Sequence, residues 1–149
     1  MKVNLESFPK QIEEYSLDIP CEKEEQEYVI AELAEKISQL YVQYFKPETR
    51  LALHSDRYFS EYPNQYPSDE ETVSFSGNLK SQILSSLHQK KMVLLTTHYL
   101  PEGILFDAMK HAGITQNKYK RNTLFYLPTK SRVVISMQKQ KINVYMGIG

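Results

Sequence analysis

Two pairs of polar residues stand where strands are expected to end, and their types suit acid–base chemistry. His54 and Asp56 follow a predicted strand over residues 50–53, and His98 and Tyr99 follow a predicted strand over residues 92–97. Histidine is the side chain best able to transfer protons near neutral pH. If the two strands are parallel neighbours, both imidazoles lie at one edge of the sheet, where open α/β sheets bind ligands. These four residues are therefore candidate catalytic residues, although polar residues at strand ends are ordinary in enzymes and non-enzymes alike.

A second candidate site is a stretch rich in tyrosine and proline. Residues 55–71 show neither helical nor strand periodicity, and we predict a long loop there. Tyrosine gives a large contact area with few rotatable bonds and is enriched in binding hot spots. Three acidic residues close the stretch, which would present a negative, aromatic surface to a basic protein. The predicted partner-binding residues are Tyr58, Phe59, Tyr62, Tyr66, Asp69, Glu70 and Glu71.

A third candidate is a basic, aromatic cluster in the second half of the chain. Cations follow phosphates while bases stack on aromatic rings, so such a mixture suits nucleic acid. The candidates are Lys118, Tyr119, Lys120, Arg121 and Arg132. The sequence signatures of RRM, KH and zinc-finger modules are absent, and a sequence pI of about 6.9 is low for a nucleic-acid-binding domain. Nucleic-acid binding therefore stands behind protein binding.

Several other chemistries have no support in the sequence. Two pairs of possible metal ligands occur, His54 with Asp56 and Asp107 with His111, but a zinc site needs three or four ligands. The five glycines form no phosphate-binding loop. A single cysteine, Cys21, excludes an internal disulfide and favours a reducing compartment. No apolar run exceeds four residues. We predict a cytoplasmic protein with no metal, no cofactor and no membrane segment.

Charge is divided sharply along the chain although the formal net charge is zero. Residues 1–75 carry 16 acidic and 7 basic side chains, a net of −9, whereas residues 76–149 carry 2 acidic and 11 basic side chains, a net of +9. Such asymmetry points to a charged partner. The alternative is that the two halves pack together and neutralise each other.

The periodicity of apolar residues predicts the elements that would position these candidates. Helices are expected over residues 23–45, from a cap at Asn78, and over 101–113. Strands are expected over 50–54, 72–76 (an edge strand), 92–97, 123–127, 132–137 and 142–146. Residues 1–22 lack a clear period and could form a helical turn or a covering arm.

These elements predict a single α+β domain over residues 1–149, with about three helices packed on a mixed sheet that ends in a three-stranded antiparallel meander. Our leading functional hypothesis is a small protein-binding module of the inhibitor, immunity or adaptor type. It would use the acidic helix and the tyrosine-rich loop to bind a basic protein. The alternatives are an enzyme of unknown class that uses His54 and His98, and a nucleic-acid-binding protein that uses the basic meander.

Overall fold

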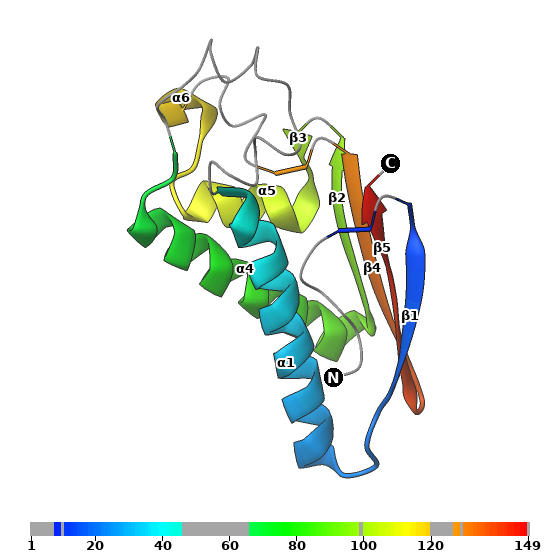
Figure 1. Ribbon diagram of the computed structural model, residues 1–149. Coiled ribbons are helices and arrows are strands. Elements are labelled where there is room, and N and C mark those ends of the chain that lie inside the picture. The colour runs from blue at the N-terminus through cyan, green and yellow to red at the C-terminus, as the bar shows by residue number, and fades with distance from the viewer. Residues whose placement is uncertain are drawn as a thin grey trace.

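The computed structural model of the protein describes residues 8–9, 11–45, 66–98, 100–119, 127–128 and 130–148. In these residues, three helices cover one face of an antiparallel sheet, and the core lies between the two layers (Figure 1). The predicted α+β class is therefore confirmed.

Within the described residues, the sheet has five strands in the order β1-β5-β4-β2-β3. They are β1 (Glu13–Asp18), β2 (Met92–His98), β3 (Leu100–Pro101), β4 (Lys130–Gln138) and β5 (Lys141–Ile148). Every pair among the described strands is antiparallel, so the parallel pair that a mixed sheet requires is not among them. Both neighbours of β2 run opposite to it: β3 pairs with it through His98↔Leu100 and Thr97↔Pro101, and β4 pairs along its other edge. The parallel partner predicted over residues 50–54 lies outside the described residues.

The β4–β5 hairpin confirms two strands of the predicted meander, while residues 123–126 of the third lie outside the description. Side chains alternate along the paired strands between the core and the opposite face. The row Val93, Ile135 and Val144 is buried against the helices. The next row along the strands, Leu94–Val134–Tyr145, points to the face that no described helix covers.

The N-terminal segment corrects another prediction, because residues 13–18 form a strand rather than a helical turn or a separate arm. β1 pairs with β5 from Glu13↔Met146 to Asp18↔Lys141. Only one of its six residues, Leu17, is buried, as is common for an edge strand with one partner. Its sequence therefore lacks the repeated apolar alternation that would have predicted it, and its partner lies more than a hundred residues away.

α1 (Lys23–Val42), continued by a 3-10 turn at Gln43–Phe45, has the predicted limits. Its apolar residues recur at spacings of three and four, which places them on the face that packs on α4 (Asp69–Lys90) and joins the core. Glu24 and Glu25 occupy its first turn, where carboxylates interact favourably with the helix dipole.

The N-cap of α4 lies ten residues before the predicted cap at Asn78, so the predicted edge strand at 72–76 is wrong. Ser68 is the actual N-cap: its hydroxyl accepts from the Glu71 amide at 3.1 Å, and the Glu71 carboxylate accepts from the Ser68 amide at 2.8 Å. This capping box holds Thr72–Ser76 in the helix although the segment includes β-branched Thr72 and Val73. The predicted loop over residues 55–71 therefore ends by Ser68.

The third helix, α5 (Gly103–His111), starts two residues later than predicted because Pro101 belongs to β3. Gly113 has φ +81° and ends α5 as the sequence predicts, with the Ile114 amide donating back to the Met109 carbonyl at 2.9 Å. One further turn, α6 (Gln116–Tyr119), follows.

Candidate functional site

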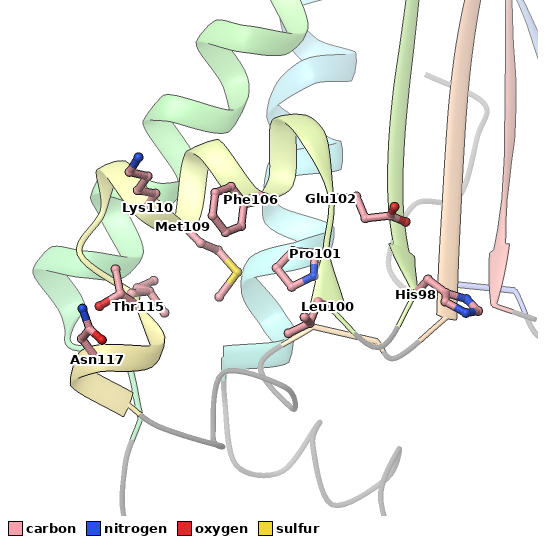
Figure 2. Close-up of a pocket in the computed structure, with 10 residues that line it drawn as sticks. His98, Leu100, Pro101, Glu102, Phe106, Met109, Lys110, Thr115 and Asn117 are labelled. Carbon is pink, nitrogen blue, oxygen red and sulfur yellow. The ribbon is translucent and has the colours of Figure 1, made fainter.

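A cleft of about 640 Å³ opens where α5, α6 and the β2–β3 hairpin meet. In Figure 2, Phe106 and Met109 descend from α5 toward Leu100 and Pro101, with Thr115 and Asn117 on the α6 side and His98 beside the strand ends. Its described lining is His98, Leu100, Pro101, Glu102, Phe106, Met109, Lys110, Ile114, Thr115 and Asn117.

Local backbone geometry creates the cleft from one short stretch of chain. β2 reverses tightly, pairing His98 with Leu100, and the Glu102 amide then donates to the Thr96 carbonyl at 3.1 Å. Gly103, with φ +52°, sits at the sharp entry into α5, a conformation that glycine adopts without strain. The hairpin and α5 therefore form two walls, and the turn at Gly113 directs α6 to close one end.

The interior of the cleft is mainly apolar. Met109 and Ile114 are buried at its base, whereas Phe106 and Leu100 are 53% and 42% exposed. Large apolar side chains that remain in water within a concave surface are typical of ligand sites. Lys110, Thr115 and Asn117 add hydrogen-bond donors on the α6 side. The cleft can therefore hold a small molecule that has an apolar body and one polar end.

Of the predicted catalytic residues, His98 lines this cleft, while His54, Asp56 and Tyr99 lie outside the described residues. Sequence reasoning missed Leu100, Phe106 and Met109 as site residues. Only Phe106 gave a sequence signal for this site. It is strongly apolar, yet it does not lie on the buried helix face that Leu105 and Ala108 share.

The predicted partner-binding residues that are described differ in their exposure. Tyr66 is half-buried, and Asp69 and Glu70 are exposed in the first turn of α4. Glu71 is buried and engaged in the capping box and with Lys118 Nζ at 2.9 Å. Tyr58, Phe59 and Tyr62 lie outside the description. Glu71 thus has a structural role in this fold.

The predicted nucleic-acid cluster is also divided. Lys118 lies in α6 and reaches toward Glu71, whereas Arg132 lies on β4 with its side chain on the face away from the helices. Lys120 and Arg121, and the side chain of Tyr119, lie outside the description. The described cations of this candidate site, Lys118 and Arg132, therefore lie on different layers of the fold.

Contacts between helices show that the acidic and basic halves partly neutralise each other. Lys80 Nζ of α4 lies 3.2 Å from a carboxylate oxygen of Glu35 on α1. His88 of α4 contacts the Glu27 carboxylate at 2.6 Å, a contact that is an ion pair only when the ring is protonated. The Lys118–Glu71 pair also joins the two halves. Each pair has at least one exposed member, so each contributes modestly to stability.

A buried polar cluster lies where α1 meets the strand ends. The Thr97 hydroxyl donates to the Pro128 carbonyl at 2.6 Å and lies 2.7 Å from the Ser131 hydroxyl. The Tyr41 hydroxyl is buried nearby without a hydrogen bond in the described structure. Burial raises the pKa of Tyr41 strongly, because ionisation would place a negative charge in the core. The folded state therefore favours the neutral form of the Tyr41 side chain.

Within the described ranges, no three His, Cys, Asp or Glu residues are grouped to hold a metal ion. The His111 ring bonds the Asp107 carbonyl oxygen at 2.8 Å, which makes that pair a local helix contact. None of the described helices combines the length and hydrophobicity that crossing a bilayer requires.

Comparison with known proteins leaves the cleft as the main guide to function. No protein-family model matches the chain, and neither the curated proteins nor the solved structures give a significant match.

Proposed function

We propose that this chain is a binding protein for a small, largely apolar molecule that occupies the cleft between α5, α6 and the β2–β3 hairpin. The observation that carries the proposal is the exposure of Phe106 and Leu100 inside a concavity of about 640 Å³. Cavities of roughly 300–1,000 Å³ with apolar linings are the usual sites for small ligands.

The exposed apolar area provides the affinity. Covering the exposed parts of Phe106 and Leu100 removes about 150 Å² of apolar protein surface from water, worth about 4 kcal/mol at 25 cal/mol per Å². Ordering and association costs reduce that gain, while the apolar surface of the ligand adds to it. A micromolar dissociation constant is the expected result.

The polar rim favours one class of ligand. Lys110, Thr115 and Asn117 lie on the α6 side, and the ammonium and amide groups among them can donate hydrogen bonds. A ligand with an apolar body and an anionic or carbonyl end would direct that end toward them. Glu102, at the hairpin side, disfavours a second negative group there.

A fluorescent probe of this class, 8-anilinonaphthalene-1-sulfonate, tests the proposal. We expect saturable micromolar binding to the native protein, weakened about tenfold by Phe106→Ala because the probe loses its largest contact. Tyr28→Ala is the matched control, since Tyr28 is an aromatic residue 71% exposed on α1 that does not line the cleft. Equal probe affinity in the native protein and in Phe106→Ala would refute the proposal.

A second candidate is binding of a basic protein by the acidic start of α1, for which Tyr28 is the specific observation. Its exposed ring lies beside Glu24 and Glu25, and these three residues line a shallow hollow together with Pro20 and Val29. A lysine or arginine side chain seated there would meet carboxylates and an aromatic face together.

The same two variants distinguish this candidate from the first, with the test variant and the control variant exchanged. Binding of a poly-lysine peptide, measured by calorimetry, should fall in Tyr28→Ala and remain in Phe106→Ala. It should also weaken as salt rises, because exposed charges are screened. A peptide affinity that Tyr28→Ala leaves unchanged removes this candidate.

A further inference from the structure

α6 (Gln116–Tyr119) forms one end of the cleft but buries little of its own surface. Thr115 and Asn117 line the cleft on this side (Figure 2). The side chains of α6 that the structure describes, Asn117 and Lys118, are both exposed. A helix of four residues has too few internal hydrogen bonds to be stable alone. Contacts with the rest of the fold must therefore hold α6 in place.

Two of these contacts lie at opposite ends of the segment. At its start, Ile114 is buried, and its amide donates to the Met109 carbonyl at 2.9 Å. Near its end, Lys118 Nζ donates to Glu71 Oε2 at 2.9 Å. The α6 side of the cleft lies between these two points. This wall is therefore held by the core at one end and by an ion pair at the other.

Glu71 is a fixed partner for that ion pair. Its side chain is 10% exposed, and its second carboxylate oxygen, Oε1, accepts from the Ser68 amide at 2.8 Å. The turn between α5 and α6 also lies beside it, since a Cβ on Gly113 would be 3.8 Å from Glu71 Oε2. The apolar face of α4 is in turn buried in the core. Lys118 therefore attaches α6 to a rigid part of the fold.

From this geometry we infer that Lys118 is a positioning residue for the cleft, because its ion pair with Glu71 holds α6 where it closes one end. This role rests on the proposed function of the cleft. With the pair broken, α6 moves away from the ligand in some molecules, and the apparent dissociation constant rises as the fraction with a complete site falls. Lys118 is 59% exposed, so water competes for its ammonium group and the expected change in affinity is about three- to fivefold.

An uncharged fluorescent probe, N-phenyl-1-naphthylamine, tests this role, because salt cannot act on the charge of the probe. Lys118→Met removes the ammonium group and keeps an unbranched side chain, and it should raise the dissociation constant about three- to fivefold. Lys118→Arg keeps a charged donor and should restore most of the native affinity. Lys80→Met is the matched control: it breaks the 3.2 Å ion pair of Lys80 with Glu35, and Lys80 does not line the cleft.

Salt separates positioning from a general loss of stability. Screening weakens the ion pair, so the difference in probe affinity between the native protein and Lys118→Met should shrink as NaCl rises from about 20 to about 300 mM. Circular dichroism melting verifies that each variant is folded at the titration temperature. A native protein that binds no probe refutes the proposed function and this role together. Native binding that Phe106→Ala weakens and Lys118→Met leaves unchanged overturns this role alone, as do equal losses in Lys118→Met and Lys80→Met.

Discussion

Replacing Glu71 should destabilise the fold much more than its position in an acidic, surface-like stretch suggests. Its carboxylate accepts from the Ser68 amide at 2.8 Å and from Lys118 Nζ at 2.9 Å, and its side chain is only 10% exposed. One side chain thus joins the start of α4 to α6. Glu71→Ala removes both contacts, whereas Glu71→Gln keeps an oxygen for the Ser68 amide and loses the negative charge.

The size of each effect follows from these contacts. Losing the capping interaction costs about 1 kcal/mol, and losing the ion pair with the half-exposed Lys118 costs about 0.5 kcal/mol. Leaving the Ser68 amide without its acceptor adds about 1 kcal/mol. We expect Glu71→Ala to lower the free energy of unfolding by about 2–3 kcal/mol, and Glu71→Gln and Lys118→Ala to lower it by about 0.5–1 kcal/mol each.

Urea unfolding followed by circular dichroism measures these differences, with Glu70→Ala as the control because Glu70 is exposed in the same helical turn. Combining Glu71→Ala with Lys118→Ala should cost less than the sum of the two, since the second change finds the pair already broken. A loss below about 0.5 kcal/mol for Glu71→Ala would refute the structural role of this carboxylate. Equal losses for the alanine and glutamine variants would show that charge, and not capping, dominates.

Three further predictions concern the backbone and the buried phenol. Lys91 ends α4 with φ +59°, so Lys91→Gly should raise the free energy of unfolding by about 0.5–1 kcal/mol in urea unfolding; a decrease would contradict this. A Cβ at Gly147 would lie 2.6 Å from the Gln11 carbonyl oxygen, so Gly147→Ala should lower the free energy of unfolding by about 1–3 kcal/mol and with it the melting temperature. An unchanged melting temperature would show that the backbone of Gln11 does not lie against Gly147. Burial raises the pKa of Tyr41, whereas tyrosine in the unfolded chain ionises near pH 10, so the fold loses stability as pH rises above about 10. Tyr41→Phe should therefore shift the midpoint of alkaline unfolding to higher pH. An unshifted midpoint would contradict the burial argument.

Much of the fold was predictable because its main elements have strong local signals. Ile30, Leu33, Ile37 and Leu40 mark one helical face, and Gly113 marks the end of α5. β1 was missed because an edge strand buries little and its partner, β5, lies at the other end of the chain. The start of α4 was missed because β-branched residues were given more weight than the Ser68–Glu71 capping box, a signal that the sequence does contain.

The cleft was predictable only in part, for a physical reason. Sequence order shows that His98 follows a strand, but it does not show that a two-residue strand reverses the chain there. It also does not show that α5 leaves Phe106 facing the hairpin instead of the core. Whether a concave surface forms depends on how packed elements meet, and no local pattern encodes that.

Methionine methyl resonances test the proposed ligand site most directly, because the described methionines occupy distinct environments. Met109 lines the cleft, Met92 lies on the sheet face that no described helix covers, and Met146 is fully buried in the core. In protein labelled at the methionine methyls, titration with 8-anilinonaphthalene-1-sulfonate at constant protein concentration should shift the Met109 signal with the binding curve. The Met92 and Met146 signals should remain in place. Saturation of the probe with Met109 unmoved would contradict ligand binding in the cleft.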